Sequence, residues 1–185
     1  LRGVNPRIGY MLQRDSLFEW RTIYKNTVLG LEIQNQLTPD RIRDVDELLA
    51  KYGLASFKDH RPSQLSGGMR QRAALIRTLA VNPDILLLDE AFSALDYQTR
   101  LAVNDDIYQI IKSEGKTAVM VTHDIAEAIS MSERLYVLSK RPGEIKLAMD
   151  IQFGMKNRTP LQSREAPEFR SYFNKVWKEL DIHVS

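Results

Sequence analysis

Two carboxylates follow an apolar run near the middle of the chain. Residues 85–88 read Ile-Leu-Leu-Leu, and Asp89 and Glu90 come directly after them. A run without polar alternation is typical of a parallel-sheet strand buried on both faces, and such sheets bind ligands beyond the carboxyl ends of their strands. Because adjacent strand residues point to opposite sides, the two acids can do different work. Asp89 suits a magnesium ion, directly or through water, and Glu90 suits the orientation or deprotonation of an attacking water. The alternative is an acid pair that is solvated or caps the next turn.

A serine and two glycines stand where a helix is expected to begin. Residues 65–72 read Leu-Ser-Gly-Gly-Met-Arg-Gln-Arg. Backbone N–H groups at a helix start have no intrahelical acceptor, and the positive end of the helix dipole points outward. Since Gly67 and Gly68 have no side chains, an anion such as a phosphate can approach this backbone closely. The alternative is a glycine-rich loop with Ser66 as a helix cap, but the full octet favours the phosphate interpretation.

Further polar residues follow the expected strands. Ser93 and Asp96, within six residues of Glu90, can bridge to a second subunit; the alternative is that this segment caps the following helix, and both can hold. His123 follows an expected strand at residues 117–122 and can donate a hydrogen bond to a phosphate oxygen; the alternative is an ordinary, satisfied polar side chain. Gln13 follows an expected strand at residues 8–12.

The elements that must position these residues alternate between strands and helices, which predicts an α/β fold with a parallel sheet. Thr38-Pro39-Asp40 opens one helix with a capping residue, an early proline and an acid in the first turn. The expected strands are residues 8–12, 85–88, 117–122 and 135–139, with a last hairpin strand within 141–150. The expected helices are residues 22–33, 38–53, 66–82, 98–113, 125–130 and 169–180.

The composition narrows the class of protein. A length of 185 residues suits one domain, or one domain with a small annex. The share of 43% hydrophobic and 27% charged residues excludes a disordered or collagen-like chain. A net charge of +2 gives no support for a nucleic-acid partner, and none is expected. Cysteine is absent, which excludes disulfides and thiolate metal sites. No apolar run approaches the roughly 20 residues that span a bilayer, so a soluble, cytosolic protein is expected.

Together these motifs resemble the nucleotide-binding subunit of an ABC transporter. Residues 65–72 are similar to the family's signature motif, and residues 85–90 to its Walker B strand with the catalytic glutamate. Residues 93–96 resemble the D-loop, His123 the switch histidine and Gln13 the Q-loop glutamine. Five motifs in the right order cover about residues 8–150.

The resemblance implies a P-loop NTPase-like, mostly parallel sheet with a helical subdomain. Residues 1–150 are then a partial nucleotide-binding domain, with the helical subdomain at about 18–80, and residues 151–185 are a C-terminal extension with one amphipathic helix. It implies ATP and Mg²⁺ as cofactors, with catalytic Glu90 and His123. The implied nucleotide contacts are Gln13, Ser66, Gly67, Gly68 and Asp96, and the implied Mg²⁺ ligands are Asp89 and Gln13.

The resemblance also implies partners. Two subunits, expected to form a homodimer, sandwich two ATP molecules head to tail, so that each supplies the serine-glycine tip to its twin. Membrane permease subunits dock directly, and a periplasmic or lipid-anchored solute-binding protein acts indirectly. The implied location is peripheral, on the cytoplasmic face of the cell membrane.

One family element is missing from the sequence, namely the P-loop G-x-x-x-x-G-K-[ST]. Gly115-Lys116-Thr117 does not qualify, because Ile110 stands where the first glycine belongs and the segment follows a helix and precedes a strand. The family carries its P-loop upstream of Gln13, and the chain starts at Leu1, so we expect an N-terminal truncation. The chain alone is then expected neither to bind ATP tightly nor to hydrolyse it.

Residues 17–22, Leu-Phe-Glu-Trp-Arg-Thr, are similar to the LxPWRT stretch of nitrate, sulfonate and taurine importers, with Glu19 in place of proline. Residues 141–145 and 167–169 also resemble that subgroup. We expect the surface around residues 17–22 to receive the permease, although Trp20 can equally be a core residue. Two other functions stay open: a non-transport ABC ATPase, and a non-catalytic pseudo-ATPase that serves as an interaction subunit.

Overall fold

The computed structural model describes residue 5 and residues 7–180. These residues form two compact units that divide between Val121 and Thr122. The nucleotide-binding domain predicted to end at residue 150 follows from family likeness, and that boundary stays a prediction.

The first unit is built on a parallel sheet in the order β1-β2-β3. Its strands are β1 (Ile8–Met11), β2 (Ile85–Asp89) and β3 (Thr117–Val121). Tyr10 pairs with Leu87 across β1 and β2, and Asp89 pairs with Val121 across β2 and β3. The predicted parallel sheet is confirmed, and its carboxyl edge carries the segments that follow Met11, Asp89 and Val121.

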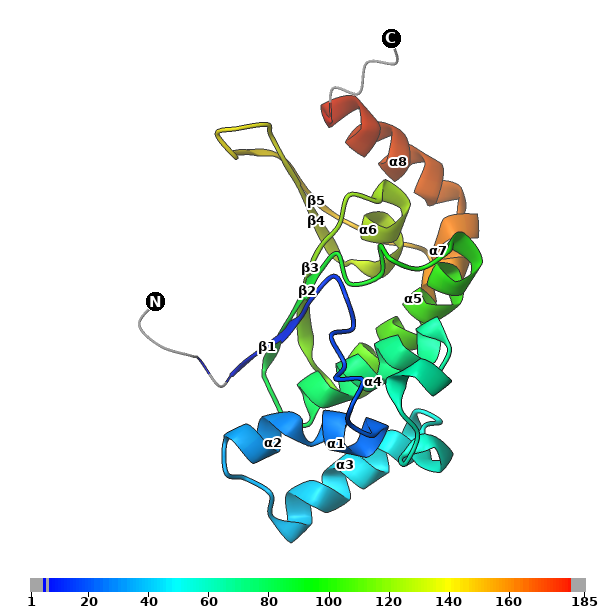
Figure 1. Ribbon diagram of the computed structural model, residues 1–185. Helices are drawn as coiled ribbons and strands as arrows, with labels where there is room; N and C mark the ends of the chain where they lie inside the picture. The colour runs from blue at the N-terminus through cyan, green and yellow to red at the C-terminus, as the bar shows by residue number, and fades with distance from the viewer. Residues whose placement is uncertain (1–4, 6, 181–185) are drawn as a thin grey trace. The chain divides into compact units, whose positions relative to one another are not determined.

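Helices α4 (Gly67–Leu79) and α5 (Tyr97–Ser113) lie on the same side of this sheet (Figure 1). Leu86 and Leu88 of β2 are buried on that side. Strand β1 approaches α4 so closely that a Cβ on Gly9 would lie 2.6 Å from the Thr78 methyl carbon. A glycine is therefore required at the point where the strand meets the helix.

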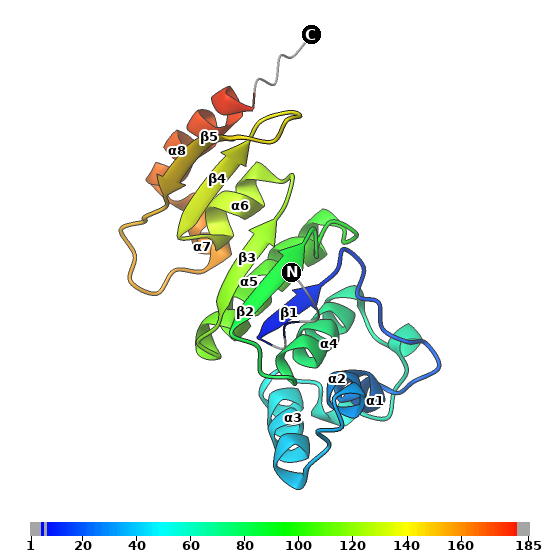
Figure 2. The same cartoon turned by 90° about the vertical axis from the view of Figure 1, so that its left-hand side faces the viewer.

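The other face of the sheet differs from the prediction. Strand β2 was expected to be buried on both faces, but Ile85 is 37% exposed, and Val119 and Val121 of β3 are 51% and 58% exposed. Figure 2, in which the sheet faces the viewer, shows no described helix of this unit in front of it. A continuous apolar sequence shows that a strand tolerates burial on both sides, but it does not supply the element that would cover it.

The helical part of this unit contains α1 (Ile23–Thr27), α2 (Leu29–Ile33) and α3 (Pro39–Lys51). A single helix was expected over residues 22–33, and the structure instead breaks it at Val28, where ψ is -2°. Two consecutive β-branched residues, Thr27 and Val28, favour a break at this point because they crowd the preceding turn. Helix α3 begins as predicted, with Thr38 as its cap. Two short 3₁₀ turns, Ala55–Phe57 and Pro62–Gln64, lead to α4.

The second unit packs α6 (Ile125–Met131), α7 (Pro160–Glu165) and α8 (Pro167–Glu179) with a hairpin of β4 (Arg134–Leu138) and β5 (Ile145–Asp150). The strands are antiparallel, as the predicted hairpin requires. The core of this unit contains Ile129, Leu135, Val137, Met149, Ile151 and Val176. Helix α8 is the predicted amphipathic C-terminal helix, whereas α7 was not predicted.

Candidate functional site

Gln13 and Glu90 meet at the carboxyl edge of the parallel sheet. Gln13 follows β1 and Glu90 follows β2, so pairing of these strands brings the two residues together. The Gln13 Nε2 group donates to Glu90 Oε2 at 3.3 Å and to Ser93 Oγ at 3.2 Å. We call Gln13, Asp89, Glu90 and Ser93 the Gln13 cluster. Its oxygen atoms stand beyond the strand ends, where ligands of parallel sheets bind.

The backbone at Glu90 has an unusual conformation. Its φ is +46°, in the left-handed region that few residues other than glycine adopt. The Glu90 N–H donates to Val121 O at 2.8 Å, and the Glu90 carbonyl accepts from Ser93 N at 3.1 Å and Ser93 Oγ at 2.9 Å. These bonds hold a tight turn at the end of β2. Strained residues persist where surrounding structure holds them and are frequent at functional sites.

Asp89, the last residue of β2, faces a different partner. Its Oδ2 accepts a hydrogen bond from the Tyr10 hydroxyl at 2.7 Å, and this hydrogen bond raises the pKa of Tyr10. The two acids therefore have separate environments, as alternation along a strand predicts. Sequence reasoning missed Tyr10. Its signal was its register, because Tyr10 pairs with Leu87 and Asp89 is the next residue of β2 on the same face.

The donor set of this cluster suits a hard cation. It offers carboxylate oxygens from Asp89 and Glu90 with an amide and a hydroxyl, all preferred by Mg²⁺. Among the residues that the structure describes, no group of three or more His, Asp or Glu side chains is placed to hold a metal ion. Proteins usually bind Mg²⁺ through one or two carboxylates together with substrate phosphates, and the Asp89 carboxylate at the strand end fits that kind of site.

The signature motif forms the start of α4. Ser66 caps the helix, and its Oγ accepts from Met69 N at 3.3 Å. A Cβ on Gly67 would lie 3.0 Å from Leu95 Cδ2, and a Cβ on Gly68 would lie 2.9 Å from Val103 Cγ2. The glycines thus allow the helix tip to pack closely on Leu95 and on α5. The predicted Ser66 cap is present, and the contact of Gly67 and Gly68 with a phosphate stays a prediction.

Asp96 caps α5, and its Oδ1 accepts from Thr99 N at 3.0 Å. Hydrogen bonds from Thr99, first from its side chain and then from its backbone, lower the pKa of Asp96. The capping role foreseen for this segment is confirmed, and a contact of Asp96 with nucleotide or a second subunit stays a prediction. His123 comes two residues after β3 and belongs to the second unit, so its role beside Glu90 also stays a prediction.

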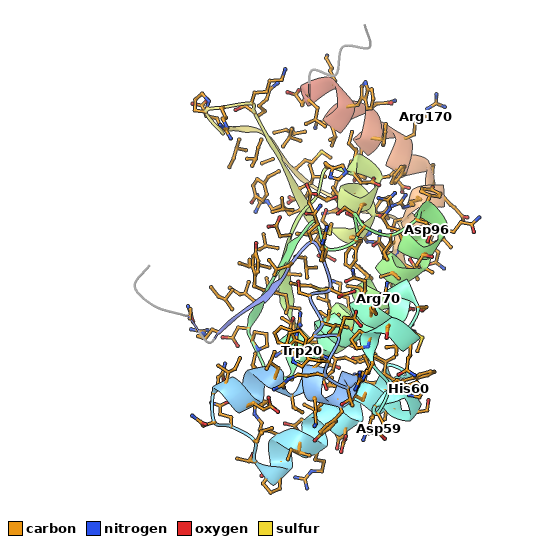
Figure 3. All side chains as sticks on the ribbon, viewed as in Figure 1. Trp20, Asp59, His60, Arg70, Asp96 and Arg170 are labelled. Carbon is orange, nitrogen blue, oxygen red and sulfur yellow. The ribbon has the colours of Figure 1, made fainter. Side chains whose placement is uncertain are left out.

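Trp20 lies on the segment that leads into α1 (Figure 3). Figure 3 also labels Arg70 of α4 and Asp96, which precedes α5. Trp20 is 71% exposed and stacks on Phe18 with ring centroids 4.6 Å apart. The alternative that Trp20 is a core residue is therefore wrong. The segment is held from beneath by Asn26, which is fully buried and bonds both the N–H and the carbonyl of Phe18.

Comparison with known proteins identifies the family of this chain. A family model described as ABC transporter matches residues 2–93. The uncharacterized ABC transporter ATP-binding protein YtlC of Bacillus subtilis is 47% identical over 94% of this chain and 67% of its own length. The nitrate import ATP-binding protein NrtD of Synechocystis is 38% identical over 91% and 65%, and the taurine import ATP-binding protein TauB of Jannaschia is 39% identical over 78% and 54%. The chain thus spans about two thirds of the length of its relatives, or less.

A solved structure agrees in fold. CbiO1 from Clostridium perfringens, part of the ABC transporter complex cbiONQ, superposes with a TM-score of 0.67 at 26% identity, over 78% of this chain and 57% of that one. The chain belongs to the ABC transporter ATP-binding proteins, and it has their α/β ATPase fold. None of the described helices has the length and apolarity that a membrane span requires.

Proposed function

We propose that this chain belongs to the ATP-hydrolysing subunit of an ABC importer for a small anion. The observation that carries the proposal is the Gln13 cluster, in which the Gln13 side chain lies 3.3 Å from the Glu90 carboxylate beyond the ends of two parallel strands. The names of the nitrate and taurine import relatives, together with the Leu-Phe-Glu-Trp-Arg-Thr segment, support nitrate, a sulfonate or taurine as the solute.

Glu90 orients and deprotonates the attacking water in this proposal. Its carboxylate is held by the tight turn after β2, and Gln13 hydrogen-bonds one of its oxygens. Asp89, turned toward Tyr10, is the carboxylate available for Mg²⁺. When bound with ATP, Mg²⁺ supplies neutralisation of the phosphate charge. Phosphoryl transfer depends mainly on positioning and charge stabilisation, so fixed placement of these side chains is their principal contribution.

A second copy of the subunit completes each ATP site. The Ser66 tip presents backbone N–H groups at the positive end of α4, which favours an anion. In the proposed homodimer, Ser66, Gly67 and Gly68 of one protomer contact the γ-phosphate bound by its partner, and Asp96 contributes to the same contact between protomers. His123 keeps the role that the family resemblance implies, a hydrogen bond to a phosphate oxygen. Hydrolysis then requires closure of the dimer.

The surface of residues 17–22 receives the permease on the cytoplasmic face of the membrane. Its support is the 71% exposure of Trp20, stacked on Phe18, in the segment that begins four residues after Gln13. Large exposed aromatic side chains are typical of protein interfaces. Cross-linking from a probe at position 20 should capture a permease subunit, and a probe at exposed Glu47 of α3 serves as the control. Equal capture from both positions would contradict docking at this surface.

ATP hydrolysis is tested with two proteins. The 185-residue chain alone should show no micromolar ATP binding by calorimetry, because the sequence has no P-loop. A chimera that joins the amino-terminal segment of the Bacillus subtilis relative ahead of this chain supplies that loop and should hydrolyse ATP. Glu90→Gln in the chimera should retain ATP binding and lose about 100-fold or more in turnover, the usual contribution of a general base.

Glu47→Gln removes an exposed carboxylate of α3 and is the matched control. It should leave turnover unchanged. A Glu90→Gln chimera with the turnover of the Glu47→Gln chimera would contradict the assignment of Glu90. A chimera with the original Glu90 that binds ATP and does not hydrolyse it would favour the pseudo-ATPase alternative.

A further inference from the structure

Arg77 of α4 holds the loop that follows Gln13. Its Nη2 donates to the Asp15 carbonyl at 2.7 Å, and its Nη1 donates to the Ser16 carbonyl at 2.7 Å. Ser16 has a φ of +49°, so the loop turns sharply at this point. Burial lowers the pKa of Arg77 and the Asp15 carboxylate opposes that effect. The guanidinium remains charged, and its planar fork matches the two carbonyls at once.

Arg70 holds the same loop through a side chain. Its Nε lies 3.1 Å from Asp15 Oδ2, and its Nη1 donates to the Leu65 carbonyl at 2.8 Å. Arg70 lies in the signature octet, one turn after Ser66. Asp15 is therefore fixed to α4 twice, by its carboxylate and by its carbonyl.

These contacts limit where Gln13 can lie. Gln13 contacts Glu90 and Ser93 at the end of β2, whereas Asp15 and Ser16 are attached to α4. Only Arg14 stands between the two attachments. A chain spans at most about 3.6 Å per residue, so fixing Asp15 confines the Gln13 Cα to within about 7 Å of it.

We propose that Arg77 and Arg70 are positioning residues for Gln13, so that helix α4 sets the place of the Gln13 side chain beside Glu90. This inference rests on the proposed function for its catalytic meaning, and on contacts within the first unit for its geometry.

The geometric part is tested by NMR on the 185-residue chain without nucleotide. The Gln13 side-chain amide, assigned with Gln13→Ala, should have a shift displaced from that of a glutamine without these two hydrogen bonds, because Nε2 donates to Glu90 and Ser93. Arg77→Met should move it to the shift of such a glutamine and accelerate backbone amide exchange at residues 13–17 by about tenfold or more, the equivalent of losing one or two charge-assisted hydrogen bonds. Arg77→Lys, which keeps the charge and reaches one carbonyl at a time, should give an intermediate shift.

Arg72→Met is the matched control on the same helix. Arg72 Nη1 lies 2.5 Å from Asp106 Oδ2 of α5, so this variant removes an ion pair of α4 on a different partner. The Gln13 resonance should stay at its original shift in Arg72→Met. Equal displacement in both arginine variants, or no displacement in Arg77→Met, would overturn the proposal.

The catalytic part is tested in the chimera. Arg77→Met should lower kcat by about tenfold or more while the KM for ATP changes by less than about twofold, because the change acts on positioning in the reacting complex. An unchanged kcat would remove the catalytic meaning. A chimera with the original sequence that does not turn over ATP would contradict the proposed function, and the NMR result would still decide whether Arg77 places Gln13.

Discussion

Asn26 offers a strong test of how the Trp20 segment is held. The side chain is fully buried, and its Oδ1 accepts from Phe18 N at 2.7 Å. Its Nδ2 donates to the carbonyls of Phe18, Arg21 and Thr22 at 3.1, 3.4 and 3.0 Å. Asn26→Leu keeps a side chain of similar size and removes all of these bonds.

The magnitude follows from which groups lose their last partner. The Phe18 carbonyl still accepts from Arg21 N at 3.0 Å, and the Thr22 carbonyl still accepts from Asn26 N at 2.9 Å. The Phe18 N–H, by contrast, loses its acceptor, and the Arg21 carbonyl loses its long bond of 3.4 Å. One buried unsatisfied donor costs about 1–3 kcal/mol, and the net loss of the other bonds adds about 1 kcal/mol. We expect Asn26→Leu to lower the free energy of unfolding by about 2–4 kcal/mol.

Asn26→Asp distinguishes the hydrogen-bond network from simple packing. The carboxylate still accepts from Phe18 N but faces three carbonyl oxygens, so burial and repulsion raise its pKa above the unfolded value of about 3.9. The folded state then binds the proton more tightly. Asn26→Asp should be close to the parent protein at low pH and lose stability as the pH rises through the raised pKa.

The assay is urea unfolding followed by Trp20 fluorescence in a Trp177→Phe background, which leaves Trp20 as the single tryptophan. Emission from Trp20 reports the segment that Asn26 holds. Asn26→Leu within about 0.5 kcal/mol of the parent, the range of ordinary surface changes, would refute the network as the support of this segment. A stability of Asn26→Asp that does not vary with pH would refute the orientation of the amide.

Three further predictions concern the helix starts and one contact between helices. Gly68→Ala should lower the thermal unfolding midpoint, because the added Cβ would lie 2.9 Å from Val103 Cγ2. The same change in a Val103→Ala background should have no such effect. An equal loss in both backgrounds would contradict the packing role of Gly68. Hydrogen bonds from Thr99 lower the pKa of Asp96. The stability that this cap contributes should therefore be present above the unfolded pKa of the carboxyl and be lost as the pH falls through the lowered pKa. Asp96→Asn should reduce this loss of stability at acid pH in calorimetric scans, and an unchanged loss would argue against the cap. Burial raises the pKa of Glu114, but hydrogen bonds from Lys51 and Tyr52 outweigh this effect and lower the pKa overall. Lys51→Met should therefore reduce the loss of stability at pH values below the ordinary pKa range of a carboxyl group. Identical profiles of stability against pH would exclude this contact between α3 and the end of α5 as a source of stability.

The sequence predicts that Gln13, Asp89 and Glu90 stand at strand ends, because the signals for strand ends are local. The apolar run before Asp89 and Glu90 indicates the end of one strand, and Gln13 follows the end of another expected strand. Once the strands are parallel and adjacent, the segments that follow them begin at the same edge of the sheet. The proximity of Gln13 and Glu90 is therefore a consequence of topology, whereas the exact place of the Gln13 side chain also depends on the loop that follows it.

Residues that act through long-range contacts gave no comparable signal. Arg77 lies 61 and 62 residues beyond the two carbonyls that it binds, and in α4 it reads as one polar position among several. Asn26 similarly reads as a polar residue in a short helix, although its side chain is fully buried. The exposed face of β2 and β3 shows a further limit, because strand composition reports tolerance of burial and not the presence of a covering element.

The two glycines of the signature motif unite the sequence and structural interpretations. Sequence reasoning assigned their missing side chains to the approach of an anion, whereas the structure places Leu95 and Val103 where those side chains would be. Both can hold, because a helix start can pack on one side and present its N–H groups on another. Gly67 then brings the tip of α4 against the segment of residues 93–96, while Arg70 attaches the same turn to Asp15. The tip of α4 therefore contacts both the segment that contains Ser93 and the loop that follows Gln13, the two flanks of Glu90.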